Sequence, residues 1–152
     1  MKPILLIFLL SFLPAHAAFD VFIKFETAGN GLPDVTGNSQ DAEYRGSEGW
    51  SEVLSFDFGV KNTIDFSTPP PNVTTASFEK FLFGKKVSGG SASLFLASAS
   101  GKHYHSATIV VKQPGDGPGS TGARLMQIEL RLIFIESIKN SGRDGDDIVQ
   151  ED

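Results

Sequence analysis

The sequence contains no cysteine and only a modest share of charged residues. Without cysteine it can form no disulfide, carry no thiolate nucleophile and build no cysteine zinc site. Charged residues make up 20% of the 152 residues and the formal net charge is −5. This balance disfavours a nucleic-acid partner, because phosphate backbones are bound by clustered lysine and arginine. Glycine and proline, at 16 and 8 residues, stay below the roughly 25% typical of low-complexity chains, so one folded domain is expected.

The longest apolar run lies at the N-terminus. Lys2 supplies a positive charge, residues 4–13 are apolar at nine of ten positions, and Ala-His-Ala at 15–17 fits a signal-peptidase site. Ten residues are too few to cross a bilayer, which takes about 18 or more. We therefore expect residues 1–17 to be a cleaved secretory signal. The mature protein is then secreted or periplasmic, with no membrane association after signal removal.

The remaining chain has the pattern of a mainly β domain over residues 18–137. Alternating apolar residues, or runs of β-branched and aromatic residues, predict strands over 19–25, 50–58, 73–83, 104–111 and 124–135. Apolar residues at helical spacing predict one short helix over 91–100, with Ser88 as its cap and Gly101 at its end. The five apolar side chains on one face of 124–135 predict that this strand is central to the core.

Two segments lack such patterns. Residues 27–49 form a 23-residue loop, and loops beyond roughly 12 to 15 residues are usually functional or disordered. Residues 138–152 are rich in acidic side chains and glycine, which predicts an acidic polar tail in contact with solvent.

The candidate chemical sites are weak. His103 and His105 lie two apart on a predicted strand, so they can point the same way and share a metal, but no third ligand is identifiable and ring packing is the favoured interpretation. Asp144, Asp146 and Asp147 lack the spacing of a calcium loop. With no cysteine, no G-x-S-x-G motif and no paired-carboxylate spacing, no enzyme activity and no cofactor are expected.

Several segments together resemble a known family. Gly37-Asn38-Ser39 is followed by the run WSEVLSFDFGV, which begins at Trp50. This is similar to the Hcp family, the haemolysin-coregulated proteins of type VI secretion, in which a G-E-S precedes a W-I-E-V-x-S-F-x-W-G segment. Further segments match in order and spacing at 19–24, 77–80, 99–104, 107–112 and 125–132.

The resemblance implies a β-barrel flanked by one short α-helix, which assembles into homohexameric rings that stack into a hollow tube. Spike, sheath and effector proteins of type VI secretion are the implied partners. The family's loop after the first strand joins subunits, which implies an assembly role for Gly37, Asn38, Ser39, Asp41, Tyr44 and Trp50. Further strands of the family begin near Asp152, so a truncated C-terminus is expected. The alternative is an exported monomeric β-barrel binding domain that has lost tube assembly.

Overall fold

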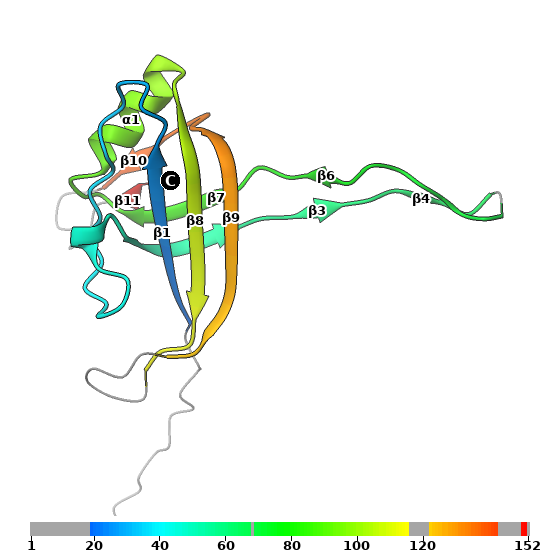
Figure 1. Ribbon diagram of the computed structural model, residues 1–152, viewed down its shortest axis with the longest axis horizontal. Coiled ribbons are helices and arrows are strands. Elements are labelled where there is room, and N and C mark those ends of the chain that lie inside the picture. Colours follow the sequence, from blue (N-terminus) through cyan, green and yellow to red (C-terminus); the bar gives the residue numbers. More distant parts are fainter. Residues whose placement is uncertain (1–18, 68, 116–121, 143–149, 152) are drawn as a thin grey trace, which may run out of the picture.

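The computed structural model describes residues 19–67, 69–115, 122–142 and 150–151. Its body is a seven-stranded antiparallel sheet with one α-helix beside it, and a long two-stranded arm leaves the body on one side (Figure 1). The predicted signal peptide and the three aspartates of the predicted tail lie outside the described residues.

The elements of the body and the arm have the following bounds. The sheet contains β1 (Asp20–Thr27), β2 (Ser51–Asp57), β7 (Leu82–Lys86), β8 (His103–Lys112), β9 (Arg124–Phe134), β10 (Asn140–Ser141) and β11 (Gln150–Glu151). The arm contains β3 (Val60–Lys61), β4 (Ile64–Asp65), β5 (Asn72–Val73) and β6 (Ser77–Phe78). The helix α1 spans Ser91–Ser100, and a short 3-10 turn, η1, spans Gly46–Glu48.

The strand order is β10-β11-β7-β2-β1-β8-β9. In Figure 1, the antiparallel strands β1, β8 and β9 lie side by side along one axis while β2 and β7 cross behind them, so the sheet bends strongly around its interior. β1 lies between β2 and β8 and pairs with both: Val21 pairs with Val53 of β2, and Ile23 pairs with Ile109 of β8. A mainly β fold with one flanking helix is thus confirmed. Among the described residues the order stays open, with β9 at one edge and β10 at the other.

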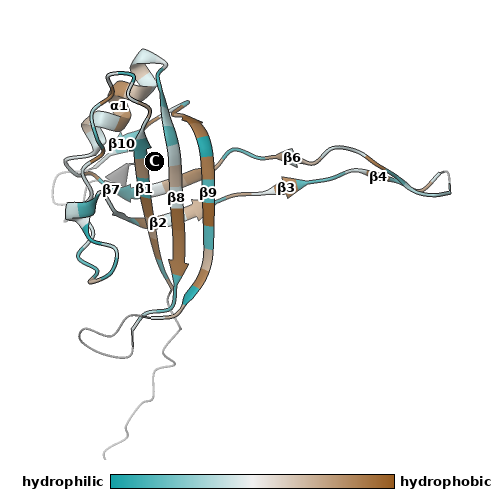
Figure 2. Ribbon diagram, viewed as in Figure 1, coloured by the Kyte–Doolittle hydropathy of each residue, from teal (hydrophilic) through white to brown (hydrophobic). Residues whose placement is uncertain are grey.

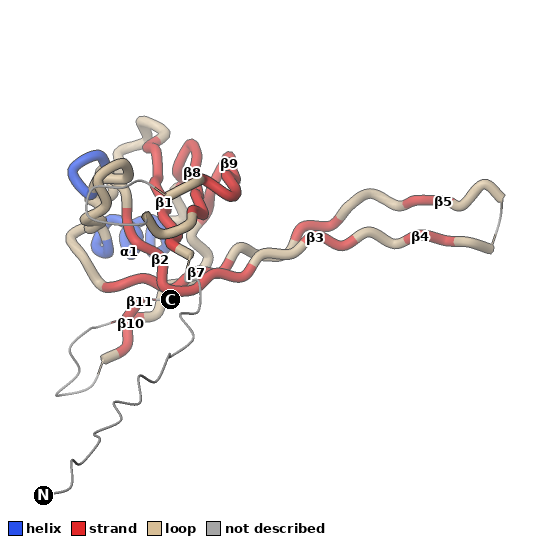
Figure 3. Tube along the Cα trace, turned by 90° about the horizontal axis from the view of Figure 1, so that it is seen from below, coloured by secondary structure: helices blue, strands red, loops and turns tan. Residues whose placement is uncertain are grey.

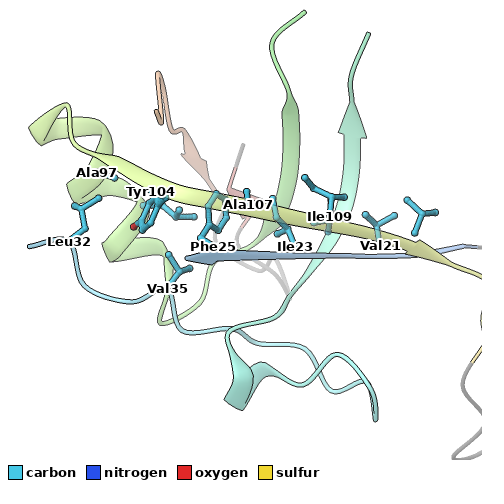
Figure 4. Close-up of a cluster of buried hydrophobic side chains, with 12 residues drawn as sticks. Val21, Ile23, Phe25, Leu32, Val35, Ala97, Tyr104, Ala107 and Ile109 are labelled. Atoms are coloured by element: carbon cyan, nitrogen blue, oxygen red, sulfur yellow. The ribbon is translucent and has the colours of Figure 1, made fainter. Parts of the chain in front are cut away.

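The main core fills the inside of the bend (Figure 4). Inward residues of β1 and β8 form its centre, and α1 covers one end with Leu94 and Ala97, which are 2% and 0% exposed. The long loop adds Leu32 and Val35 to the same cluster. Burial of each large aliphatic side chain contributes about 1.5–3 kcal/mol, so this cluster supplies the stability that disulfides provide in cysteine-rich domains.

A second, smaller core lies on the outer face of the sheet. It contains Phe22, Tyr44 and Val110, with Trp50 packed against them. Phe22 comes from the face of β1 opposite to Ile23, so this strand is covered on both faces. The loop of residues 27–49 provides the outer cover.

The helix has the predicted bounds, but its start differs from the prediction. Gly90 is the N-cap and no side chain caps the helix, whereas Ser88 lies two residues earlier and donates its N–H to the Ser91 hydroxyl at 3.0 Å. Gly101 ends the helix as predicted, with φ of 66°, a left-handed conformation that glycine adopts without strain. The prediction of Ser88 as the cap was therefore wrong.

The predicted central position of the strand over 124–135 is also wrong. Among the strands that the structure describes, β9 pairs only with β8 and lies at the edge of the sheet. Leu125 and Phe134 of β9 are each 57% exposed, while Ile128, Leu130 and Ile133 are half-buried against the core. Hydrophobic and hydrophilic bands alternate along β9 in Figure 2, and this alternation specifies two faces without specifying the strand's neighbours.

The chain between β2 and β7 forms the arm in place of the single predicted strand over 73–83. β3 pairs with β6 and β4 with β5, which makes a ribbon that extends far from the body in Figures 1 and 3. The predicted acidic tail contains two strands that the sequence did not indicate. β10 pairs with β11, and β11 pairs with Lys85 and Lys86 of β7.

Candidate functional site

The residues predicted for subunit assembly lie together at the end of the long loop. Ser39 donates its N–H to the Trp50 carbonyl at 3.1 Å, and the Asn38 side chain accepts the N–H of Glu52 at 3.3 Å. These bonds fasten the loop to the start of β2. A Cβ on Gly37 would collide with the Trp50 backbone, so only glycine allows this close approach.

Asp41 organises the next turn of the loop. One carboxylate oxygen accepts the N–H groups of Glu43 and Tyr44 at 2.9 and 3.0 Å, and the Asp41 N–H donates to the Ser39 hydroxyl at 3.1 Å. The other carboxylate oxygen lies 2.5 Å from Nζ of Lys112. Burial acts to raise the pKa of Asp41, but these hydrogen bonds and the Lys112 charge outweigh it and lower the pKa below its ordinary value of 3.8.

Lys112 is the centre of this arrangement. Its side chain is only 2% exposed, and its Nζ lies 5.3 Å from the ring centroids of both Phe22 and Tyr44. The two rings stack at 5.0 Å, and Tyr44 meets Trp50 edge to face at 4.9 Å. A buried cation thus has an anion and two aromatic faces as neighbours, which compensates its loss of hydration.

Three members of this cluster were not predicted: Phe22, Lys112 and Arg124. Arg124 donates to the Tyr44 hydroxyl at 3.2 Å and lies 3.7 Å from Glu43. Phe22 was detectable as an apolar residue on the otherwise polar face of β1. Lys112 gave no signal, because a lysine at the end of a strand ordinarily lies in solvent. We call Asp41, Tyr44, Trp50, Phe22 and Lys112 the loop lock.

The two candidate metal ligands do not form a metal cluster. His103 is half-buried, with its ring 5.3 Å from that of Phe134, whereas His105 is exposed. The register between β1 and β8 shifts in this region, because Glu26 pairs with Ser106 and Thr27 with Tyr104, which leaves His105 outside the pairing. Tyr104 lies in the core. No group of three or more histidine, cysteine or acidic side chains suited to a metal occurs within the described part of the chain.

A polar pocket of about 500 Å³ lies beside the lock. Lys24, Glu26, Asp34 and Glu48 are among its lining residues. The Glu26 carboxylate accepts a hydrogen bond from the Ser106 hydroxyl at 2.9 Å, and the Asp34 carboxylate accepts one from the Thr27 hydroxyl at 3.2 Å. Two of the acidic side chains of the pocket therefore hold the local structure.

Over the described ranges, no helix is long and apolar enough to cross a membrane.

The arm is amphipathic. Cross-strand pairs place Val60 opposite Phe78 and Ile64 opposite Val73, and directly opposed residues of an antiparallel pair share a face. Their exposures are 61%, 70%, 47% and 57%, and Phe66, towards the tip, is 75% exposed. We call this surface the apolar face of the arm. The opposite face carries the pair of Lys61 and Ser77.

Together, the bent β sheet, the flanking helix, the fastened loop and the projecting arm define a mainly β protein with a long exposed arm. The chain belongs to the family described as type VI secretion system effector, Hcp, whose model matches residues 22–151. It is 26% identical over 137 residues to Protein hcp1 of Pseudomonas aeruginosa, covering 88% of this chain and 75% of that protein.

Solved structures agree with this assignment. A structure described as that of a type six secretion system protein superposes with a TM-score of 0.71 at 25% identity, covering 88% of this chain and 76% of the other. The crystal structure of Hcp1 from Salmonella typhimurium superposes with a TM-score of 0.60 at 22% identity, covering 88% and 77%. The resemblance to the Hcp family seen in the sequence is therefore confirmed.

Proposed function

We propose that this chain is a self-assembling structural protein of type VI secretion, which forms rings of six subunits that stack into an inner tube. Membership of the Hcp family supports this role. Carriage of effectors and contact with spike and sheath proteins are part of the same proposal, and no catalytic step is assigned to the chain.

The observation that carries the proposal is the apolar face of the arm. A two-stranded ribbon without a core of its own is marginally stable in water. This ribbon exposes five large apolar side chains, of which Phe78 stacks on Phe58, and the described residues leave each of them 47% to 75% exposed: Val60, Ile64, Phe66, Val73 and Phe78. An arm of this kind is stabilised when it lies on the surface of a neighbouring subunit, where those side chains leave water.

The loop lock also supports the proposal, because it provides a second surface for subunit contacts. It holds residues 37–50 in one conformation, so their outer surface is preformed before any subunit arrives. Preformed surfaces associate at lower entropic cost than mobile loops. The assembly role of Gly37, Asn38, Ser39, Asp41, Tyr44 and Trp50 is part of this proposal.

Removal of the apolar face tests the assembly. We expect the purified protein to form a discrete oligomer in light scattering, and the double variant Val60→Ser with Phe78→Ser to leave no species larger than a dimer. Lys61→Ser is the matched control, because it changes the opposite face at the same level of the arm. If the unchanged protein is monomeric at every accessible concentration, the exported monomeric binding domain becomes the better account.

Export is a separate proposal. We propose that residues 1–17 are removed during secretion, because a positive residue, a short apolar run and Ala-His-Ala follow one another there. N-terminal sequencing of exported protein should begin at Ala18. A product in the cytoplasm that retains Lys2 would contradict it.

A further inference from the structure

The outward face of α1 is apolar. Residues three, four and seven positions apart share one face of a helix, and in α1 these positions hold Ala92, Phe95, Leu96 and Ala99. Such a stripe ordinarily faces the core. Here all four residues are exposed, with Phe95 57% and Leu96 47% exposed, and no residue of α1 is charged. We call these four residues the outer stripe of α1.

The orientation of α1 is fixed by its inward face. Two apolar residues of the helix lie in the main core, and its other buried residues are serines. The Ser93 hydroxyl donates to the Asp34 carbonyl of the long loop at 3.1 Å, and the Ser91 hydroxyl accepts a hydrogen bond from Nζ of Lys85 at 3.0 Å. Rotation of the helix to bury the outer stripe would break these hydrogen bonds and leave buried polar groups unsatisfied. The fold therefore holds the outer stripe in solvent.

The arm and the outer stripe lie on opposite sides of the body. In Figures 1 and 3 the arm leaves the body on the side of β9, whereas α1 lies on the far side. The arm of one copy therefore points away from its own helix and towards the helix side of a copy placed ahead of it. Head-to-tail contacts of this kind use two different surfaces of each copy, and they form a closed ring when the rotation closes.

We infer that the arm of one copy docks on the outer stripe of α1 in the next copy. This inference rests on the proposed self-assembly and names the surface that receives the arm. Both surfaces are apolar, and their lengths match. The apolar pairs of the arm at Val60 and at Ile64 are four residues apart, about 13 Å along an extended strand. The ends of the outer stripe are seven residues apart, about 10 Å along a helix.

The outer stripe fits the arm better than β9 does. Leu125 of β9 is as exposed as Phe95, at 57%. However, β9 lies on the side of the body from which the arm leaves, and its exposed pair of Arg131 and Glu129 would lose water beneath an apolar ribbon. The outer stripe has no charge to desolvate. A membrane surface is a poorer occupant, because helices that bind it carry lysine and arginine on their polar face, and α1 has neither.

Cross-linking tests the contact directly, because the chain has no cysteine of its own. One protein carries Val73→Cys on the arm and a second carries Phe95→Cys on α1; both sites are 57% exposed, and cysteine is a small apolar side chain that preserves the contact. The two proteins are mixed when dilute, concentrated, and treated with a short bifunctional maleimide. We expect a covalent pair with one copy of each. Leu125→Cys, equally exposed on β9, replaces Phe95→Cys as the matched control and should give no such pair.

Removal of the outer stripe gives a second readout. Phe95→Ser with Leu96→Ser should weaken assembly in light scattering about tenfold or more, while circular dichroism stays unchanged because both side chains point outward. If the unchanged protein assembles but the arm cysteine joins the Leu125→Cys protein or neither protein, or if the serine variant assembles as well as the unchanged protein, the inference is wrong and the proposed self-assembly still stands. An unchanged protein that is monomeric at every accessible concentration would overturn both.

Discussion

Replacement of Lys112 by methionine is the most informative single perturbation of the folded chain. Methionine keeps an unbranched apolar stem beside the stacked Phe22 and Tyr44 rings but removes the charge and the hydrogen bond to Asp41. The Asp41 carboxylate, 19% exposed, then loses its only charged partner among the described residues. The expected result is a less stable protein with a loosened loop.

The size of the effect follows from the burial of the pair. Removal of one partner from a buried ion pair costs about 3–5 kcal/mol, because the other charge stays uncompensated. Asp41 keeps its bonds from the Glu43 and Tyr44 amides, so we expect the lower end, about 3 kcal/mol. A small domain has a net stability of roughly 5–15 kcal/mol, so the loss is easily measured.

Urea unfolding of wild type, Lys112→Met, Asp41→Asn and the double variant measures the coupling between the two residues. The double variant should lose clearly less stability than the sum of the two single losses.

The pH dependence gives a second test. Because Asp41 has a lowered pKa when folded, its contribution to the free energy of unfolding is present above the ordinary pKa of 3.8 and is lost as the pH falls through the folded pKa. The destabilisation by Lys112→Met should therefore be full at pH 7 and shrink below about pH 4. Additive losses, or no loss at pH 7, would refute this account of the loop lock.

Three further substitutions have defined outcomes. Tyr104→Phe removes a buried hydroxyl that has no hydrogen-bond partner among the described residues, so stability at pH 7 should rise by about 1 kcal/mol or stay level. Burial, with the nearby Asp34 charge, raises the pKa of Tyr104 to about 12, so the wild type should lose stability between pH 10 and 12 and the variant should lose less. Leu132→Gly should stabilise by about 1 kcal/mol, because Leu132 has φ of 56° and a mostly exposed side chain; lower stability in thermal unfolding would contradict this. Gly37→Ala should cost about 2 kcal/mol or more through its collision with Trp50, unlike Ala42→Ser on the exposed loop surface.

Local patterns were sufficient to predict four strands and the helix of the body: β1, β2, β8, β9 and α1. Strict alternation identified β1 and β2, and helical spacing identified α1 with its correct bounds. These signals work because each element buries one face, and burial imposes its period on the sequence. The predicted loop residues also lie together, because Ser39 donates its N–H to the Trp50 carbonyl and Gly37 packs closely against the Trp50 backbone.

Other features depend on contacts that no local pattern encodes. The β-branched and aromatic residues over 73–83 predicted one strand, because the same residue types occur in a strand of a sheet and in a ribbon whose apolar side chains stay exposed. β9 was placed at the centre because five apolar residues share one of its faces, although the sheet order leaves it at the edge. The role of Lys112 depends on Asp41, 71 residues away in sequence, and the packing of the long loop on the outer face of β1 and β8 brings them together.

The attachment of the arm determines how the body responds to a pull. Its two strands continue into β2 and β7, which lie side by side and point along the arm in Figures 1 and 3. Hydrogen bonds between antiparallel strands lie across the strand direction, so tension applied at the tip loads all the bonds of β2 and β7 to the rest of the sheet together, in shear. A partner that grips the arm therefore pulls against many bonds at once, and the body resists extraction far better than if the arm were joined to a single edge strand that could be peeled away bond by bond.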